Sequence, residues 1–488
     1  MILLVQAGDF PKIDRKARMR LKSQGLLVRP ANERVRDFDE IVLLGDEKWA
    51  QYEASRCIHC YGRPPCQQAC PAGNDISQAM TLIEQGKFIE AANVYRQTTT
   101  FPEICGRVCP QEKLCEGACV RNRRGDPVPT GALEAFVTEY QRRTVGVEIP
   151  VPASTGRKVA IVGAGPSGLA CAEQLVRMGH WVTIFDNHPA PGGALTYGFP
   201  NFKLPHTLLE SIFKSIQKAG VSFVGNIMIG KKKTVNDLFN DGFESVFLGL
   251  GSGIDQPLGI PGEYLRGVYF ATDFLVRSVQ IKKLLPSRLR TPPEVGGRVV
   301  VVGGGDPATD CARTAIRLGA RKVTCLYRYT EQEIPGRGHD RFVDRHAGLS
   351  ASSRAEEEGV EFRYLTRPVR FTEGERGHVG GMDCVRVEIG EPDEAGQLHP
   401  YPVEDSEFHI EADTVIIAKG YYPDPIVGAT TPGLRTHKWG LIVADSATGA
   451  TSRFGVYTGG DIVTGPDMVV TAMLAGRKAA YTIDAYLS

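Results

Sequence analysis

Two stretches of the chain share one pattern of apolar and polar positions. Each has an apolar run of strand length, a glycine turn, a segment of helical period and a second apolar run: KVAIVGAGPSGLACAEQLVRMGHWVTIFD (158–186) and RVVVVGGGDPATDCARTAIRLGARKVTCLYR (298–328). This order is typical of a βαβ unit, so we expect an α/β protein with two Rossmann-like dinucleotide-binding domains rather than a solenoid. Later in the chain, residues 413–420 predict a strand, and residues 455–487 predict a strand, a Gly-Gly-Asp turn and a helix.

The chain before the first βαβ unit has helical periodicity. Asn74–Asp75 can cap a helix that contains Ile76, Met80 and Ile83, and further helices fit residues 88–97 and 132–143. A segment rich in Pro, Gly and small residues (146–156) reads as a linker. We therefore expect a helical domain over residues 1–150, one nucleotide-binding domain over 157–270 and 421–488, and a second inserted into it over 271–420.

Composition and charge exclude several classes of protein. The 488 residues suit about three domains of ~150 residues, 42% are hydrophobic, and the net charge of +1 indicates no nucleic-acid or membrane partner. The only apolar run at the N-terminus is Ile2–Val5, so we expect a cytoplasmic protein whose thiols stay reduced. The basic run Lys12–Lys22 reads either as a solvated helix face or as a docking patch for an acidic partner.

Eight of the twelve cysteines lie between residues 57 and 119, in two groups of four: Cys57, Cys60, Cys66 and Cys70, then Cys105, Cys109, Cys115 and Cys119. The first group ends in Cys-Pro, as the bacterial ferredoxin run does, and the second lacks the paired knuckles of zinc sites. We favour iron–sulfur clusters over zinc or unligated thiols. By the logic of two-cluster ferredoxins, Cys57, Cys60 and Cys66 share one cluster with a cysteine of the second group, and Cys70 serves the other.

The four other cysteines are isolated in the sequence. They are predicted to be small buried hydrophobic residues: Cys171, Cys311, Cys325 and Cys384.

The first glycine turn has the spacing of a dinucleotide fingerprint, with Gly163, Gly165 and Gly168. Asp186 ends the following strand, where a ribose hydroxyl needs an acceptor. We favour FAD because Gly460–Asp461 belongs to a returning C-terminal segment whose helix, starting near Asp467, can stabilise a reduced flavin. Residues 191–205 contain no cysteine pair, so electrons leave this flavin elsewhere, and the cysteine region is the obvious route.

The second glycine turn carries Gly303, Gly305 and Ala308. Tyr327 occupies the position that corresponds to Asp186, and Arg328 follows it. The absence of an acid and the presence of a nearby arginine favour binding of the 2′-phosphate of NADP. The alternative is that Arg328 is a solvated surface residue without this role.

With these motifs in place, the chain from about Pro30 resembles the small (β) subunit of NADPH-dependent glutamate synthase. The resemblance rests on RCIHC (56–60), CQQACPAGN (66–74), FPEICGRVCPQEKLCEGACV (101–120), VGAGPSGLACAEQL (162–175), GGALTYGFPNFKL (192–204), VVGGGDPATDCARTA (301–315), LYR (326–328) and YTGGDIVTGPDMVVTAMLAGRKAA (457–480). The module also resembles the flavin–iron–sulfur parts of dihydropyrimidine dehydrogenase and of NADH-dependent ferredoxin:NADP oxidoreductases.

The resemblance implies FAD, two [4Fe–4S] clusters and hydride exchange with NADP or NAD, with no catalytic side chain required. Its motifs add Gly193, Leu195 and Met468 to the cofactor-binding residues. In relatives a non-cysteine ligand follows the last cysteine, and Glu134 matches its position. One cluster is then held by Cys57, Cys60, Cys66 and Cys119, and the other by Cys70, Cys109, Cys115 and Glu134, which leaves Cys105 as a neighbour.

The chain departs from the family pattern in four places that affect the expected cofactor and partner. Tyr329 stands where the family has a second arginine, which weakens NADPH against NADH. Residues 336–353 form a longer loop that could reshape the nicotinamide site or a partner contact, and AKGYYPDP (418–425) replaces the usual stretch. The first 30 residues are unmatched and could serve a different partner.

The expected function is an electron relay between NAD(P)H, FAD, two clusters and either a larger catalytic subunit or a ferredoxin-like acceptor. The first hypothesis is the small subunit of glutamate synthase. The second is the NAD(P)-reducing subunit of a ferredoxin-type 2-oxoacid or aldehyde oxidoreductase complex. A third hypothesis is a non-enzymatic scaffold subunit that binds zinc and has lost nucleotide binding. The intact glycines, Asp186 and Asp461 argue against it.

Overall fold

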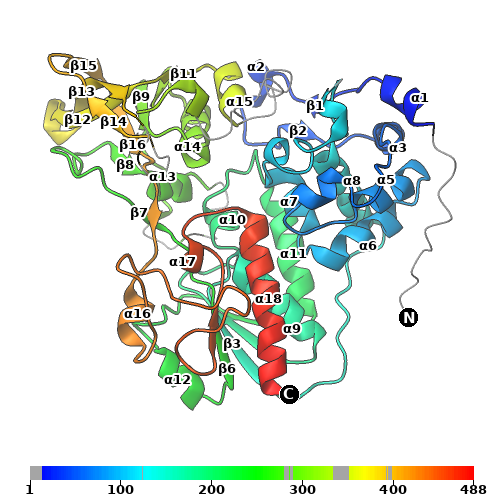
Figure 1. Ribbon diagram of the computed structural model, residues 1–488. Coiled ribbons are helices and arrows are strands. Elements are labelled where there is room, and N and C mark those ends of the chain that lie inside the picture. The colour runs from blue at the N-terminus through cyan, green and yellow to red at the C-terminus, as the bar shows by residue number, and fades with distance from the viewer. Residues whose placement is uncertain are drawn as a thin grey trace. The chain divides into compact units, whose positions relative to one another are not determined.

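The computed structural model describes residues 14–123, 125–279, 285, 289–333, 351–391, 393 and 398–488 (Figure 1). These residues form two compact units. One contains the described residues up to Val28 together with Val42–Val147, and the other contains Arg29–Ile41 and Glu148–Ser488. Most of the long loop predicted at 336–353 lies outside the described residues.

The first unit is helical, as predicted. Its helices are α1 (Arg15–Arg20), α3 (Glu47–Ser55), α4 (Pro65–Ala69), α5 (Ile76–Glu84), α6 (Phe88–Thr98), α7 (Pro102–Val108) and α8 (Thr130–Thr144), with 3-10 turns at Gln111–Lys113 and Val120–Arg123. A two-stranded ribbon joins β1 (Leu27–Val28) to β2 (Val42–Leu43). The Asp75 side chain caps α5 by accepting a hydrogen bond from the Gln78 amide at 3.0 Å. Met80, Ile83 and Tyr95 are fully buried where the helices meet.

The first nucleotide-binding domain is a five-stranded parallel sheet. Its strands are ordered β18 (Val456–Thr458), β6 (Ser245–Leu248), β3 (Lys158–Val162), β4 (Trp181–Phe185) and β5 (Ser222–Val224). Its helices are α9 (Pro166–Arg177), α10 (Ala194–Tyr197), α11 (His206–Lys218), α12 (Val235–Asn240), α16 (Ile426–Thr430), α17 (Asp461–Thr464) and α18 (Val469–Leu487). The C-terminal helix α18 runs along α9 (Figure 1). A Cβ added at Gly476 would collide with the Ser167 carbonyl oxygen, so glycine allows this close approach.

The second nucleotide-binding domain is another five-stranded parallel sheet. Its strands are ordered β11 (Val360–Arg363), β10 (Lys322–Leu326), β9 (Arg298–Val302), β16 (Thr414–Ile417) and β8 (Val268–Phe270). Helices α13 (Ala271–Ser278), α14 (Asp306–Arg317) and α15 (Ala351–Glu357) accompany it, with a 3-10 turn at Glu331–Glu333. The expected start at residue 271 is corrected to Val268, because β8 pairs with β16.

A second sheet within this domain was not predicted. It joins β12 (Thr366–Glu373), β13 (Val379–Ile389), β14 (Pro400–Pro402) and β15 (Phe408–Glu411) in antiparallel order, with a 3-10 turn at Glu375–Gly377. Alternating exposed and buried residues along β12 show that one face of this sheet is solvated.

The two nucleotide-binding domains are joined by two crossings of the chain. The outgoing crossing contains β7 (Ile254–Asp255), and the returning one contains β17 (Tyr421–Tyr422), which pairs with it in antiparallel order. The Gln256 side chain also donates to the Tyr421 carbonyl oxygen at 3.0 Å. The unusual AKGYYPDP stretch therefore builds the link between the domains, and the second domain is inserted into the first.

Residues Arg29–Ile41, with the short helix α2 (Ala31–Arg34), belong to the nucleotide-binding unit and not to the helical domain expected over 1–150. Arg34 is buried and donates to Glu358 at 2.7 Å. The Phe38 carbonyl oxygen accepts a hydrogen bond from the Asn201 side chain at 2.8 Å. This segment thus touches both nucleotide-binding domains.

Among the described residues, no helix combines the length and the apolar character needed to cross a membrane.

Candidate functional site

The structure brings together one set of four cysteines from both sequence groups. Burial raises the pKa of the Cys57 and Cys66 thiols to about 12, and the nearby Cys119 thiol raises both further. Burial also raises the pKa of Cys60, again with Cys119 as a neighbour. These four residues, here called the first cysteine set, are the ones that the resemblance assigns to one cluster.

A second set gathers around Glu134. Burial raises the pKa of Cys70, and Glu134 and Cys109 add to the shift. Burial raises the pKa of Cys115 and of Glu134 well above their ordinary values, with Cys109 as the next cause for Glu134. The second cysteine set therefore contains Cys70, Cys109, Cys115 and the Glu134 carboxyl group.

Cys105 lies beside the second set. Its hydrogen bond with Cys109 is the largest cause that raises the pKa of its thiol, followed by burial. The family resemblance implies that Cys105 is a neighbour rather than a ligand, and its hydrogen bond with Cys109 is compatible with that position.

The local structure explains why neighbouring cysteines in the sequence belong to different sets. Cys66 lies within α4, and Cys70 ends that helix with its amide donating to the Cys66 carbonyl oxygen at 3.1 Å. Cys105 and Cys109 repeat this arrangement at the end of α7, also at 3.1 Å. The end of α4 thus separates Cys66 from Cys70, whereas Cys105 and Cys109 stay within hydrogen-bonding reach of each other.

Close packing of α7 against α8 positions Glu134. A Cβ at Gly106 would lie 2.6 Å from the Gly131 carbonyl oxygen, so glycine is needed where the two helices touch. Glu134 accepts a long hydrogen bond from the Asn74 side chain at 3.5 Å, and Asn74 in turn accepts one from Thr99 at 2.8 Å. The carboxyl group is 6% exposed, which makes an unpaired charge there costly and a metal partner favourable.

The donor groups fit iron–sulfur chemistry. All twelve cysteines are free thiols, and no three Cys, His, Asp or Glu side chains of the described residues converge on a position for one metal ion. In a cluster each iron takes its own protein ligand, so the ligands surround a group of atoms rather than one ion. Seven thiols and one buried carboxyl group would supply one donor for each iron of two four-iron clusters. Cys171, Cys311, Cys325 and Cys384 are buried, as predicted.

Charged groups that were not predicted from the sequence lie around the cysteine sets. Glu116 is buried and accepts a hydrogen bond from the Gly131 amide at 2.9 Å, and burial raises its pKa to about 7. The basic run is not simply a solvated helix face, because Arg15 and Arg18 donate to backbone carbonyl oxygens of residues 55–59. The basic run is visible in the sequence, but its binding partners are not. They are backbone carbonyl groups, which every residue has, so no sequence pattern marks them.

The first glycine turn has the geometry of a pyrophosphate site. Gly163 has a φ of +101°, and Gly168 leaves no room for a Cβ against the Gly163 carbonyl oxygen. Beside Gly165 the described residues leave open space at the start of α9, where helix amides favour an anion. Gly193, with a φ of +52°, passes against the Gly165 backbone, and Leu195 is fully buried behind it.

Asp186 holds the same turn. Its two carboxylate oxygens accept hydrogen bonds from the Ala164 amide at 2.7 Å and from the His188 amide at 2.8 Å. Asp186 Oδ1 also lies 3.2 Å from His188 Nδ1, so Oδ2 is the oxygen that keeps a lone pair to accept from a ribose hydroxyl.

The returning segment completes this site. Gly460, with a φ of +85°, packs against Ser167 of α9, and Asp461 opens α17. Burial raises the pKa of Asp461 to about 7, with Asp467 as the second cause. Met468 caps α18, whose N-terminus is the positive end of a 19-residue helix.

The second glycine turn differs from the first in its surroundings. Gly303 and Ala308 pack tightly, while Gly305 borders open space in the described part of the chain. The Tyr327 ring fills the position next to Gly304 that an acid would otherwise approach. Arg328 is exposed, and its guanidinium carbon lies 5.1 Å from the centroid of the Tyr329 ring.

Two family models match the chain. The model of dihydropyrimidine dehydrogenase domain II, 4Fe-4S cluster, matches residues 34–145, and the model of pyridine nucleotide-disulphide oxidoreductases matches residues 157–476. The fold and these sites define an FAD-dependent NAD(P)H oxidoreductase with an iron–sulfur domain.

Comparison with individual relatives identifies the family within this class of oxidoreductase. The small chain of NADPH glutamate synthase from Escherichia coli (strain K12) is 38% identical over 465 residues, which are 93% of this chain and 94% of that one. The NADP⁺-dependent formate dehydrogenase subunit beta of Moorella thermoacetica is 35% identical over 87% of this chain and 60% of its own length. Mycobacterium tuberculosis FprA in complex with NADPH shares the fold, with a TM-score of 0.53, 21% identity, and coverage of 67% of this chain and 84% of that chain. The chain belongs to the family of glutamate synthase small chains.

Proposed function

We propose that this chain is the electron-transfer subunit of a larger complex and holds two [4Fe–4S] clusters. The observation that carries the proposal is that the clustered cysteines gather in two places, three of them together with Cys119 and the others around Glu134. We assign four donors to each place, with Cys105 as a neighbour. The first set is Cys57, Cys60, Cys66 and Cys119, and the second is Cys70, Cys109, Cys115 and Glu134.

When bound, FAD would supply hydride exchange with the nicotinamide, and iron–sulfur clusters would supply one-electron transfer. The protein contributes position and electrostatics. Gly163, Gly165 and the start of α9 would bind the pyrophosphate, and Asp186 would fix the ribose. Asp461 and the N-terminus of α18 would face the flavin side of the cofactor.

NADP(H) is the proposed nicotinamide cofactor. Arg328 is exposed directly after β10, where its guanidinium group can donate hydrogen bonds to a 2′-phosphate. The position where an acid would bind the 2′-hydroxyl of NAD is occupied by Tyr327, which has no carboxylate. Replacing Arg328 with Ala is expected to lower kcat/KM for NADPH by about tenfold, the value of one charge-assisted hydrogen bond, and to leave NADH almost unchanged. An equal loss for both cofactors would contradict this role.

A partner subunit is proposed to receive or supply the electrons. The matched relatives carry the names small chain and subunit beta, and in this chain the described residues 191–205 contain no cysteine pair to act as a disulfide acceptor. A glutamate-forming large subunit is the first candidate. The named formate dehydrogenase subunit supports the second, in which the chain reduces NAD(P) for another oxidoreductase complex.

The cluster assignment is tested by anaerobic purification of two variants, with iron, sulfide and flavin content and EPR spectra as readouts. Cys70→Ala is expected to lose one cluster and keep the other. Cys105→Ala, which removes a thiol four residues before Cys109, is the matched control and should keep both. Loss of a cluster from Cys105→Ala, or zinc without iron in the unmodified protein, would overturn the proposal.

A further inference from the structure

The segment Asp14–Gln24 is bound tightly to the backbone that presents the first cysteine set. Arg18 donates to the carbonyl oxygens of Ser55 at 2.9 Å and of Cys57 at 3.0 Å. Arg15 donates to those of Ile58 at 2.9 Å and His59 at 2.8 Å. Helix α1 therefore covers the loop between Cys57 and Cys60.

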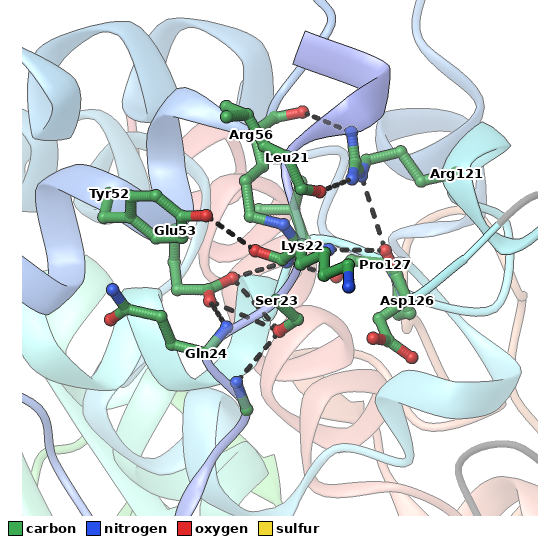
Figure 2. Close-up of polar contacts among 12 residues, drawn as sticks. Leu21, Lys22, Ser23, Gln24, Tyr52, Glu53, Arg56, Arg121, Asp126 and Pro127 are labelled. Carbon is green, nitrogen blue, oxygen red and sulfur yellow. Dashed lines mark hydrogen bonds and ion pairs between the residues drawn. The ribbon is translucent and has the colours of Figure 1, made fainter.

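Three groups of the helical unit hold this segment in place. Arg121, two residues after Cys119, donates to the Leu21 carbonyl oxygen at 2.6 Å and to that of Arg18 at 2.7 Å. Glu53 accepts from the Gln24 amide at 2.6 Å, and the Tyr52 hydroxyl donates to the Lys22 carbonyl oxygen at 2.8 Å. Figure 2 shows Arg121 and Glu53 reaching the segment from opposite sides.

The charges in this contact are unequal. Three guanidinium groups lie around the first cysteine set: those of Arg15 and Arg18 bind the backbone of residues 55–59, and that of Arg121 binds the Arg56 carbonyl oxygen next to Cys57. Glu84 pairs with one of them, Arg18, at 2.8 Å, whereas Glu53 pairs with Arg56, whose guanidinium group binds the backbone of Asp126 and Pro127. Arg121 donates to the carbonyl oxygens of Arg18, Leu21 and Arg56, and these contacts do not neutralise its charge. The surroundings of the first set are therefore positively charged.

The same charges lie close to the ligands. Arg18 and Arg15 donate to the carbonyl oxygens of residues 57–59, which belong to the loop that carries the thiols of Cys57 and Cys60. Positive charge close to the ligands favours the more negative state of whatever they bind. Net charge and hydrogen bonding around a cluster are among the main factors that set its reduction potential.

We propose that the segment Asp14–Gln24 is a built-in cover that raises the reduction potential of the cluster on the first cysteine set, with Arg15 and Arg18 as positioning residues. The inference rests on the proposed function, since it needs a cluster at Cys57, Cys60, Cys66 and Cys119. The segment precedes the residues that the iron–sulfur family model matches, so membership of the family does not by itself assign this role.

The test is an EPR-monitored redox titration of the complete protein. Arg18→Gln removes a positive charge and should lower the potential of one cluster, so that its reduced-to-oxidised ratio at a fixed potential falls about tenfold, or 59 mV for a one-electron couple. Arg18→Lys keeps the charge and should restore most of the potential. The affected signal should be the one that survives in Cys70→Ala.

Glu84→Gln gives the opposite prediction. It removes the carboxylate that partly neutralises Arg18, so the potential of the same cluster should rise. A merely structural role for the Arg18–Glu84 pair would instead move both variants in one direction. Lys16→Gln is the control, because it removes an equal charge from an exposed position of the same helix.

Each outcome decides the matter. If Arg18→Gln lowers the potential, Glu84→Gln raises it and Lys16→Gln changes neither signal, the inference stands. If both clusters are present and their potentials stay fixed in all three variants, the inference fails while the proposed function survives. If no cluster is found at the first set, the proposed function fails first. Should Arg18→Gln lose its cluster, Glu84→Gln carries the test alone, and an unchanged or lowered potential refutes the cover.

Discussion

At the scale of single residues, the charged groups buried far from the cofactor sites are as informative as the cysteines. Glu358 is buried and accepts hydrogen bonds from Arg34 at 2.7 Å, Arg313 at 2.8 Å and Arg317 at 2.7 Å. Arg34 comes from the segment Arg29–Ile41, so one carboxylate joins chain segments that are 324 residues apart. No local sequence pattern predicts such a partner.

This cluster makes stability depend on pH in a defined window. Burial pushes the pKa of Glu358 upward, but hydrogen bonds from Arg313 and Arg317 outweigh it and hold the pKa at about 2. A carboxyl group with a lowered folded pKa stabilises the protein above its ordinary value near 4.5, and that contribution fades as the pH falls toward 2. Unfolding of the nucleotide-binding unit should therefore become easier across this range.

The matched variant is Glu358→Gln, which removes the carboxylate that Arg313 and Arg317 share, while Arg34 keeps its ion pair with Glu357. We expect a loss of about 3–5 kcal/mol in the free energy of unfolding at neutral pH, with a smaller pH dependence between 4.5 and 2. Calorimetry of both proteins measures it. Equal stability of the two proteins at pH 7 would show that the cluster is not a structural joint.

At the scale of elements, much of the chain follows its local pattern. The glycine turns, the helix capped by Asp75 and the returning strand and helix at the C-terminus were all readable, because each is specified by residues close together in the sequence. The sheet β12–β15 was not, since its strands have one solvated face and therefore lack the continuous apolar runs that mark the parallel strands. The role of the basic run was also hidden, because its arginines bind carbonyl groups that leave no mark on the sequence.

The contact between α18 and α9 yields a prediction about flavin binding. Gly476→Ala gains helix propensity but drives a methyl group against the Ser167 carbonyl oxygen at the start of α9. Overpacking of this kind costs about 1–3 kcal/mol, so we expect lower thermal stability and faster loss of FAD.

Fluorescence of released flavin during heating measures this effect. Ala485→Ser, at an exposed position of the same helix, is the control and should behave like the unmodified protein. A Gly476→Ala variant that retains FAD as well as the control does would contradict a close α18–α9 contact.

At the scale of the nucleotide-binding unit, a strand pairing and an ion pair hold the first nucleotide-binding domain in position relative to the second. The β7–β17 ribbon joins them at the crossings, and a buried ion pair joins Lys203 of the first domain to Asp310 on α14 at 3.0 Å. Asp310 follows Ala308 by two residues, so the pair acts next to the second glycine turn. Its position, unlike the glycine turns, could not be read from the sequence, because the partners lie 107 residues apart.

Lys203→Met is expected to slow flavin reduction by NADPH at least about tenfold, because small displacements of reacting groups are costly and an unpaired buried carboxylate forces a rearrangement. Stopped-flow absorbance measures the rate, and flavin content should stay constant. Lys214→Met, an exposed lysine on α11, is the control. An unchanged rate in Lys203→Met would mean that the ion pair does not set the domain orientation needed for hydride transfer.

The central claim is that electrons leave the flavin through the cysteine region. Its most direct test compares two rates in Cys66→Ser under anaerobic conditions: reduction of the flavin by NADPH, and transfer of electrons from NADPH to a ferredoxin-type acceptor. The account predicts a flavin reduction rate within about twofold of the unmodified protein and a loss of at least about tenfold in transfer to the acceptor, because the nucleotide sites are intact and the first cluster is not. Undiminished transfer to the acceptor in Cys66→Ser would contradict it.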